Sequence, residues 1–384
     1  MKYYEVAVVG GGPAGSVCAS ELARNGVNVV IFDHSHPREK LCGGAISGRH
    51  LKELKIPDNV IEREINWIIV EDQHGHNVKL YERKGGIVLM REKLDYYLFQ
   101  KSKDDGAKQI KERVISFKKK KNKWILKTNK SVYKSNFLVG ADGCPSLIRK
   151  KFLGDIPKEH LAHCVSYHIP HKKSHIEKKF GDSIELYFLG EPYVDLGYIW
   201  IFPKIEFVTV GLGTKLGSSQ IQESLKNFIH DHPKTKRLIL PKEITLYSHL
   251  LPFISSSDFY KDPITGKDWV LIGDAAGHVN PLTGEGIYYA MKGGKLAAKA
   301  YLNENIYFFE TYWREEYGGD LYYGSKFRDL FYNPRLIDIV INIGNKSSKM
   351  CEILADIIAT RVPYDKLFKR KLLLSLPRIF FEAI

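Results

Sequence analysis

The sequence predicts an α/β protein in which a parallel-sheet domain is interrupted by a second, antiparallel sheet and followed by a small helical region. Three observations support this prediction. A short apolar strand at residues 4–9 leads through a glycine-rich turn into a helix, and two later apolar strands, at 137–142 and 269–274, each end in a glycine-flanked aspartate. Between them, residues 198–202 alternate aromatic and aliphatic side chains with the period of a strand.

Length and composition set limits on the function. The chain has 384 residues, of which 44% are hydrophobic and 27% charged, enough for two domains or one elaborated domain with a large core. The formal net charge of +14 fits nucleic acid, an acidic membrane face or a phosphorylated substrate, and it equally fits a lysine-rich solvated surface. No apolar run approaches the roughly 18 residues that span a bilayer.

Other classes are excluded by the start of the chain and by its cysteines. The chain passes from Met1 directly into the first strand without the segments of a secretion signal, so we expect a cytoplasmic protein. Its 5 cysteines are scattered without CxxC spacing, which argues against a disulfide framework and a zinc site, and we expect no metal. The lysine run at 118–121 has no recognition motif beside it and is interpreted as a solvated hairpin turn, so we expect no nucleic-acid partner.

The first element of the chain is a nucleotide-binding unit. A strand is followed by a glycine-rich turn and a helix, and the next strand ends at Asp33, 18 residues after Gly15. In this pattern Gly10 permits a tight turn, Gly12 lets the backbone approach a pyrophosphate, and Gly15 lets helix and strand pack closely. The helix N-terminus then holds negative charge, and Asp33 accepts hydrogen bonds from ribose hydroxyls. We therefore predict a dinucleotide site that includes Gly10, Gly12, Ala14, Gly15 and Asp33.

Two later strands end in a glycine-flanked acid. One ends in Gly140-Ala141-Asp142, and the other ends in Gly273-Asp274 and leads to Gly284-Glu285-Gly286-Ile287, which opens a helix. At the carboxyl edge of a sheet such an acid can meet a polyol, and the helix N-terminus can face carbonyl groups of a ligand. Either Gly-Asp pair alone is equally compatible with a turn or a helix cap.

Taken in this order, the three segments resemble those of the flavoprotein superfamily typified by aromatic hydroxylases. The resemblance implies bound FAD, with Asp274 holding the ribityl chain. It also implies that Arg91 lies near the cofactor phosphates and flavin and that Val114 lies beside the adenine, although a surface arginine and a core valine would look the same. The further cofactor-binding residues that it implies are Asp142, Gly284, Gly286 and Ile287.

Two more segments resemble the geranylgeranyl reductase family within that superfamily. The loop Cys42-Gly43-Gly44-Ala45 resembles the segment that passes close to the isoalloxazine ring. Residues Tyr198-Ile199-Trp200-Ile201-Phe202-Pro203-Lys204, with the trailing Gly211-Leu212-Gly213, resemble that family's Tyr-x-Trp-x-Phe-Pro-Lys segment. The resemblance covers about residues 4–300 and implies a Rossmann-like FAD-binding domain with an inserted antiparallel substrate sheet. It adds Cys42, Gly43, Gly44 and Ala45 to the expected cofactor-binding residues.

This resemblance implies an FAD-dependent oxidoreductase that saturates carbon–carbon double bonds of geranylgeranyl chains in lipids or in geranylgeranyl diphosphate. In a strand, Tyr198, Trp200 and Phe202 point to one face, and this aromatic wall fits either a tunnel for a prenyl chain or an ordinary packed sheet face. The family resemblance favours the tunnel. Cys42 is the candidate catalytic residue: it could donate the proton, place a water that does so, or only shape the loop.

Two other functions stay open. One is a flavin-dependent aromatic hydroxylase of the same fold, and the other is a flavin-containing lipid-binding protein without turnover. The electron donor, ferredoxin or NADPH, also stays open, because no second strand–GxGxxG–helix unit follows the first. We expect a monomer.

The order of the motifs predicts an interrupted chain. The FAD-binding domain comprises residues 1–60, 90–155 and 260–320, the substrate domain comprises 61–89 and 156–259, and a helical C-terminal region comprises 321–384. From Tyr364 to Ile384 the chain mixes lysine and arginine with large apolar residues. Such a tail fits peripheral contact with an anionic membrane, and it equally fits a terminal helix packed on the protein.

Overall fold

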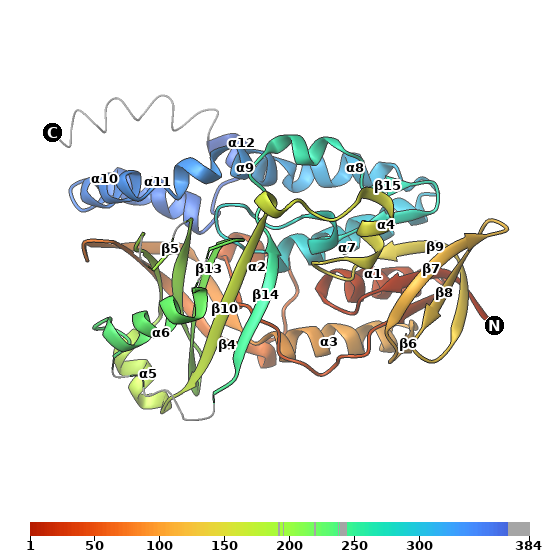
Figure 1. Cartoon of the computed structure of the whole chain (residues 1–384), viewed down its shortest axis with the longest axis horizontal. Helices are drawn as coiled ribbons and strands as arrows, with labels where there is room; N and C mark the ends of the chain where they lie inside the picture. Colours follow the sequence, from red (N-terminus) through yellow and green to blue (C-terminus); the bar gives the residue numbers. More distant parts are fainter. Residues whose placement is uncertain (191–192, 195, 219, 237, 239–243, 368–384) are drawn as a thin grey trace.

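The computed structural model of the chain describes residues 1–190, 193–194, 196–218, 220–236, 238 and 244–367. In this part of the chain, two eight-stranded sheets lie side by side along the long axis of the molecule, and helices α10 and α11 lie beside the second sheet (Figure 1). The predicted α/β class is confirmed, with a Rossmann-like domain and a helical C-terminal region.

The first sheet contains the nucleotide-binding unit. Its central strands are parallel in the order β16-β9-β1-β2-β6, and an antiparallel hairpin of β7 and β8 extends from β9. Its strands are β1 (Lys2–Val9), β2 (Val29–Phe32), β6 (Lys108–Ile110), β7 (Val114–Lys120), β8 (Lys123–Thr128), β9 (Val132–Gly140), β15 (Thr265–Gly266) and β16 (Trp269–Leu271).

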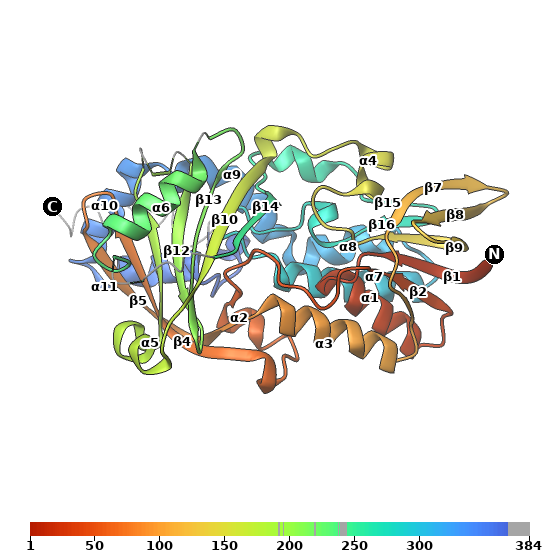
Figure 2. The ribbon, with the colours of Figure 1, turned by 60° about the horizontal axis from the view of Figure 1, so that its bottom comes forward.

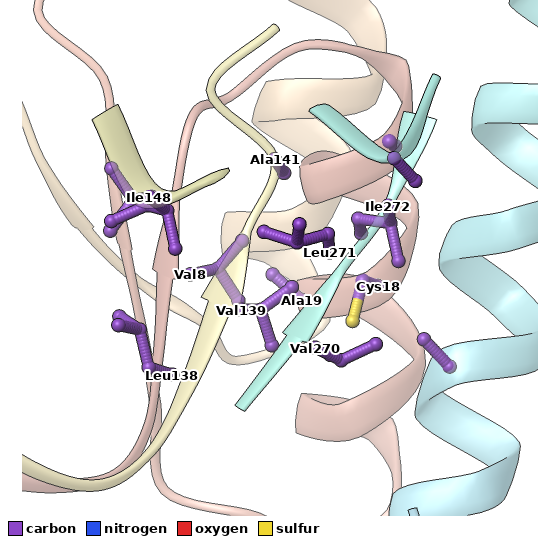
Figure 3. Close-up of a cluster of buried hydrophobic side chains, with 14 of the residues drawn as sticks. Val8, Cys18, Ala19, Leu138, Val139, Ala141, Ile148, Val270, Leu271 and Ile272 are labelled. Carbon is purple, nitrogen blue, oxygen red and sulfur yellow. The ribbon is translucent and has the colours of Figure 1, made fainter. Parts of the chain in front are cut away.

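Helices α1 (Pro13–Arg24), α3 (Arg91–Asp104) and α7 (Ile287–Leu302) pack beside this first sheet, and α4 (Leu147–Leu153) and α8 (Phe308–Trp313) complete the domain (Figure 2). The sequences of these strands are almost continuously apolar, because both faces of a parallel sheet are covered. Val8, Val139 and Val270 from three neighbouring strands meet Cys18 and Ala19 of α1 in the core (Figure 3). The carboxyl ends of these strands therefore point to one edge, where the glycine turn lies.

The second sheet follows the order β14-β10-β13-β12-β11-β4-β5-β3. Its strands are β3 (Ala45–Ile46), β4 (Ile61–Asp72), β5 (Asn77–Leu89), β10 (Leu161–Pro170), β11 (Ser183–Phe188), β12 (Gly197–Pro203), β13 (Phe207–Lys215) and β14 (Leu246–Pro252). The predicted antiparallel sheet is present with one difference, because β4 and β11 run parallel. Short hairpins impose antiparallel pairing, and no hairpin joins these two strands, which come from distant segments.

The two faces of the second sheet are covered by different helices. Helices α5 (Lys173–Phe180) and α6 (Ile221–Asp231) pack on the face of Ile199 and Ile201. Tyr198, Trp200 and Phe202 belong to the opposite cluster, which includes residues of α10 (Pro334–Gly344) and α11 (Ser348–Ile358). The alternation predicted for this strand is therefore present. The remaining helices are α2 (Gly48–Leu51), α9 (Gly319–Phe331) and α12 (Tyr364–Lys366).

The predicted domain boundaries stay a prediction. Most strands of the second sheet come from residues 61–89 and 161–252, but β3, from inside the predicted cofactor segment, pairs with β5 at the edge of that sheet. None of the helices in the described ranges combines the length and the apolar character that crossing a bilayer requires. The basic tail beyond Leu367 lies outside the described residues.

Candidate active site

A cavity of about 970 Å³ runs between the two sheets and collects residues from both. This volume is at the upper end of the roughly 300–1,000 Å³ that ligand pockets occupy. Every residue that the sequence predicted for the cofactor and the substrate lines this cavity, with the exception of Gly15. Segments that lie far apart in the chain therefore converge on one site.

The glycine turn has the geometry of a dinucleotide cradle. Gly10 has φ +103°, and a Cβ there would lie 2.2 Å from the carbonyl oxygen of Ala141. A Cβ on Gly15 would lie 1.9 Å from the carbonyl oxygen of Gly10, so Gly15 serves the packing of α1 against the turn. A Cβ on Gly12 would meet no atom within 4 Å, and no described side chain caps the N-terminus of α1. The turn thus leaves backbone N–H groups and open space for a pyrophosphate.

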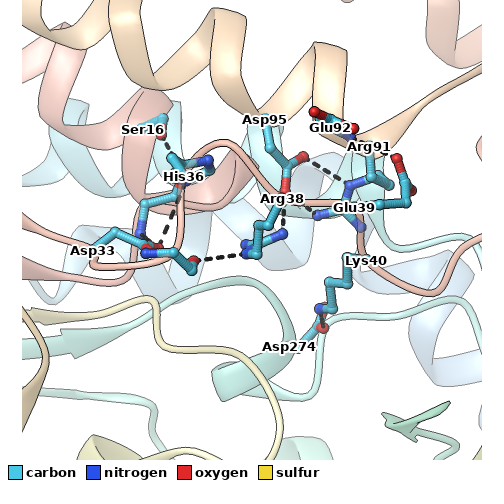
Figure 4. A network of polar contacts seen from close by, with 12 residues as sticks. Ser16, Asp33, His36, Arg38, Glu39, Lys40, Arg91, Glu92, Asp95 and Asp274 are labelled. Carbon is cyan, nitrogen blue, oxygen red and sulfur yellow. Dashed lines mark hydrogen bonds and ion pairs between the residues drawn. The ribbon is translucent and has the colours of Figure 1, made fainter. Parts of the chain in front are cut away.

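Asp33 follows β2 directly and fixes the glycine turn through hydrogen bonds. Its carboxylate accepts hydrogen bonds from the Gly11 N–H at 2.8 Å, from the Ser35 N–H at 2.8 Å and from the Ser35 hydroxyl at 2.6 Å (Figure 4). Burial raises the pKa of Asp33. The hydrogen bonds and the nearby His36 lower the pKa by more than burial raises it, so the net shift is downward. Asp33 is therefore an ionised acceptor at the cavity wall, and its contact with a ribose stays a proposal.

Arg91 begins α3 and is locked to a carboxylate in the same helix. Its Nε and Nη2 each lie 2.7 Å from an oxygen of Asp95, and Arg38 approaches the same carboxylate at 3.2 Å. Burial disfavours the charged guanidinium, yet Asp95 raises the pKa of Arg91 overall. Arg91 therefore carries a fixed positive charge at the cavity wall, and its place near the cofactor phosphates and flavin stays a prediction. Arg38 was missed because nothing in its local sequence distinguishes it from a surface arginine.

Asp274 lies where the two sheets meet. Its carboxylate pairs with Lys40 at 3.3 Å, as Figure 4 shows. Burial raises the pKa of Asp274, whereas Lys40, His249 and Arg91 lower it, and the net direction is downward. Burial, together with the charges of Lys40 and Arg91, lowers the pKa of His249 to about 4, although Asp274 opposes this. A neutral histidine from β14 thus lies near an ionised aspartate. Sequence reasoning missed Lys40 and His249, which only the fold brings to this acid.

Asp142 has a local structural role. Its two oxygens accept hydrogen bonds from the Ser146 hydroxyl at 2.5 Å and from the Ile148 N–H at 3.1 Å, at the start of α4. Burial raises its pKa. This is the helix-cap alternative of the sequence analysis, and a contact between Asp142 and the cofactor stays a prediction.

The Cys42 loop is held by backbone contacts and by a buried lysine. The Cys42 Sγ accepts a hydrogen bond from the Gly44 N–H at 3.2 Å. Lys204 donates to the carbonyl oxygens of Gly43 at 2.5 Å and of Leu89 at 3.0 Å. Burial lowers the pKa of Lys204 to about 8, although Cys42 and two glutamates oppose this. Lys204 was not predicted as a site residue, and the lysine that ends the Tyr-x-Trp-x-Phe-Pro-Lys segment was the signal that could have found it.

The aromatic wall forms the apolar part of the cavity. A Cβ on Gly211 would lie 2.1 Å from the ring of Trp200, so the trailing Gly-x-Gly makes room for this indole. The Tyr198 hydroxyl donates to the carbonyl oxygen of Thr283 at 2.7 Å, and its ring lies parallel to that of Tyr332 with centroids 6.3 Å apart. Tyr332 follows α9 in the C-terminal region, where the sequence showed no signature. It was therefore missed.

These features define a class of protein: a Rossmann-like dinucleotide-binding oxidoreductase whose cofactor cradle opens into a large aromatic cavity. The comparisons with known proteins agree. Residues 8–83 match the family described as NAD(P)-binding Rossmann-like domain. The chain is 30% identical to geranylgeranyl diphosphate reductase of Rhodobacter capsulatus, over 78% of this chain and 75% of that protein.

Two further comparisons extend this likeness. The chain is 29% identical to digeranylgeranylglycerophospholipid reductase of Methanocaldococcus jannaschii, over 85% of this chain and 86% of that protein. A solved structure of a geranylgeranyl bacteriochlorophyll reductase-like protein from Thermoplasma acidophilum has the same fold, with a TM-score of 0.78 at 22% identity, covering 97% of this chain and 99% of that one. The chain belongs to the geranylgeranyl reductase family, whose members are FAD-dependent oxidoreductases acting on carbon–carbon double bonds.

Proposed function

We propose that this protein binds FAD and reduces carbon–carbon double bonds of geranylgeranyl chains in isoprenoid lipids or in geranylgeranyl diphosphate. One observation supports this above the others: a single cavity joins the glycine turn and its charged neighbours to the aromatic wall. A prenyl chain offers no groups for hydrogen bonding, so it must be held by shape and apolar area, which this wall supplies. The names of the relatives indicate the same substrate class.

The residues at the glycine turn fit FAD. We assign the pyrophosphate to the backbone of Gly12 and the N-terminus of α1, and the adenosine ribose to Asp33. The other half of the cofactor is assigned to Asp274 and the N-terminus of α7. A Cβ on Gly286 would lie 3.5 Å from a carboxylate oxygen of Asp274, so the backbone of α7 starts close to this acid. When bound and reduced, FAD supplies hydride.

The protein's own residues must then place the alkene and exclude water. An isolated alkene accepts hydride only if a proton reaches its other carbon, and both events need contact distance in a dry cavity. Cys42 lines the cavity, and the adjacent Gly43 lies against the ring of Phe202 in the aromatic wall. We propose that Cys42 contacts the reacting double bond and is catalytic, with its loop held in place by Lys204.

Anaerobic reoxidation of the flavin tests this function. The protein, reduced with dithionite, is mixed without oxygen with geranylgeranyl diphosphate or with a digeranylgeranyl glycerolipid. We expect the flavin absorbance to return and mass spectrometry to show two added hydrogens for each double bond reduced. Reduced flavin that meets both substrates without reacting would overturn the proposal. In a parallel reaction with an added phenol, reoxidation that needs oxygen and yields the hydroxylated phenol would favour the aromatic hydroxylase.

We propose further that electrons come from an external donor, ferredoxin or NADPH, because Gly211 and Gly213 pack around Trp200 and form no second phosphate turn. Each donor is to be tested by anaerobic reduction of the bound flavin.

Membrane contact is proposed for the basic tail from Tyr364 to Ile384, on its sequence alone. Vesicles of anionic lipid should bind the full chain more tightly than a chain truncated at Asp365, and equal binding of the two would contradict this role.

A further inference from the structure

One buried pair, His50 and Glu285, has no role in the proposed function, although Glu285 lines the cavity. His50, in α2, places its Nδ1 2.9 Å from a carboxylate oxygen of Glu285, which lies at the start of α7. The His50 side chain is fully buried, and the Glu285 side chain is 9% exposed and lines the cavity. The His50 ring stacks on that of Tyr288 with centroids 3.8 Å apart, which fixes its orientation.

Three buried polar atoms lie unsatisfied in these two segments. The second oxygen of Glu285, Oε1, the Nε2 of His50 and the hydroxyl of Ser47 have no hydrogen-bond partner in the described part of the chain. Ser47 also lines the cavity. An unsatisfied buried polar group costs about 1–3 kcal/mol, and native structures keep such groups mainly where they act on a ligand or in catalysis.

Glu285 lies where the cofactor end of the cavity meets the aromatic wall. On one side, the adjacent Gly286 approaches Asp274, as described above. On the other side, the Tyr198 hydroxyl bonds the carbonyl of Thr283, two residues before Glu285. Burial raises the pKa of Tyr198, and the charges of Cys164, Cys42 and Glu285 add to this in the same direction. The carboxylate thus lies near Tyr198, the first aromatic side chain of the wall.

We propose that Glu285 delivers the proton of the alkene reduction and that His50 is the residue that positions it. The inference rests on the proposed function. The proposal requires the pair to hold one proton before the reaction, shared across the 2.9 Å contact between His50 Nδ1 and Glu285. With reduced FAD bound to supply hydride to one alkene carbon, the π electron pair would take the proton from Glu285 at the other carbon. The O–H bond of Glu285 would break, and His50 and Glu285 would be left as neutral imidazole and carboxylate. Solvent returns the proton after the saturated product leaves.

Other ionisable groups lie next to His50 and Glu285, but Tyr288, Tyr289 and Asp320 are not placed to deliver the proton. Tyr288 and Tyr289 flank His50, and burial raises the pKa of both hydroxyls. Asp320 is paired with Arg49 at 3.1 Å. Of the two carboxyl groups, Asp320 is bound by Arg49 and does not line the cavity, whereas Glu285 does.

The test compares Glu285→Gln with a matched control, Glu82→Gln. Glu82 is also a buried, cavity-lining glutamate with an unpartnered oxygen, but it lies on β5, and its other oxygen accepts the Lys84 N–H at 3.1 Å. In the anaerobic single turnover, Glu285→Gln should slow reoxidation of the flavin by geranylgeranyl diphosphate at least about 100-fold. FAD affinity of the apoprotein, reduction by dithionite and thermal unfolding should stay as in the wild type, and Glu82→Gln should react within about threefold of it.

Two readouts separate proton delivery from a structural role. The wild-type reaction should be slower in D₂O, and Glu285→Asp, which keeps the acid at a shorter reach, should retain this isotope effect with a smaller loss of rate. In the apoprotein, the nitrogen NMR signal of the His50 ring should shift in Glu285→Gln, since Nδ1 loses its carboxylate. His50→Gln should lower the rate about tenfold and keep FAD bound.

The outcomes are distinct. A wild-type protein that reduces no prenyl substrate refutes the proposed function. An active wild type with Glu285→Gln within threefold of its rate, an equal loss in Glu82→Gln, or a Glu285→Asp variant without the isotope effect refutes the proton role alone. Glu285→Asp keeps the test valid if the glutamine variant does not fold.

Discussion

The two ends of the cavity are built on different principles. At the cofactor end, backbone atoms and ion pairs decide the geometry: Gly10 and Gly15 touch neighbouring carbonyl oxygens, and Arg91 is locked to Asp95. At the other end, the wall consists of side chains such as Trp200 and Tyr332 that meet by apolar contact. We therefore expect single atoms to matter at the cofactor end, whereas total shape and apolar area should matter at the aromatic end.

The largest expected effect is at the glycine turn. Gly15→Val should abolish FAD binding, because its Cβ would overlap the carbonyl oxygen of Gly10 and force α1 away from the turn. We expect FAD affinity to fall at least about 100-fold, equivalent to about 2.7 kcal/mol, as measured by fluorescence titration of the apoprotein. In the control Gly12→Ala, the methyl group enters open space, so thermal unfolding should be unchanged. A Gly15→Val protein that binds FAD normally would show that the turn is not the cradle.

Cys42→Ala tests whether the thiol between the cofactor end and the aromatic end takes part in alkene reduction. The variant should keep FAD bound but lose at least about tenfold in alkene reduction, because the thiol lies at the cavity wall where the double bond is proposed to react. Anaerobic single turnover measures the rate. Cys351→Ala is the matched control, since Cys351 is a half-buried cysteine in α11 that bonds the Gly344 carbonyl. Full turnover in Cys42→Ala would remove its catalytic role.

A smaller effect is expected within the aromatic wall. Tyr198→Phe keeps the ring and removes only the hydrogen bond to Thr283, which contributes about 1 kcal/mol. We expect about a fivefold loss in kcat/KM for the prenyl substrate and no change in FAD affinity. A loss of FAD affinity in Tyr198→Phe would show that the aromatic wall and the cofactor end are one cooperative unit and not two independent parts of the cavity.

The last prediction concerns how stability, not activity, depends on pH. Burial lowers the pKa of Lys204 from 10.5 to about 8, so between these values the unfolded chain binds more protons than the folded one. The free energy of unfolding of the wild type should therefore rise, relative to Lys204→Met, as the pH rises above 8. Urea denaturation on both sides of that pH measures the difference. A difference that is constant or shrinks would show that Lys204 titrates normally.

Features that are determined within one short segment of sequence were predicted, whereas features that depend on distant segments were not. The turn, β1, α1 and Asp33 were predicted because one continuous segment contains the whole unit, and a glycine at a positive φ is a local requirement. The parallel pairing of β4 and β11 was not predicted, because no connection between them dictates their direction. Asp142 shows the limit of motif reasoning: the structure has it capping α4, and the motif alone allowed both a cap and a ligand.

By itself, the sequence determined that the chain has a nucleotide cradle, an aromatic strand and the signatures of its family, because these depend on spacing within short segments. Only the tertiary structure decided which distant side chains share the cavity. Lys40 and His249 meet at Asp274, and His50 meets Glu285 from a helix more than 200 residues earlier in the chain. The physical reason is that burial and charge pairing depend on three-dimensional proximity, which short sequence patterns do not contain.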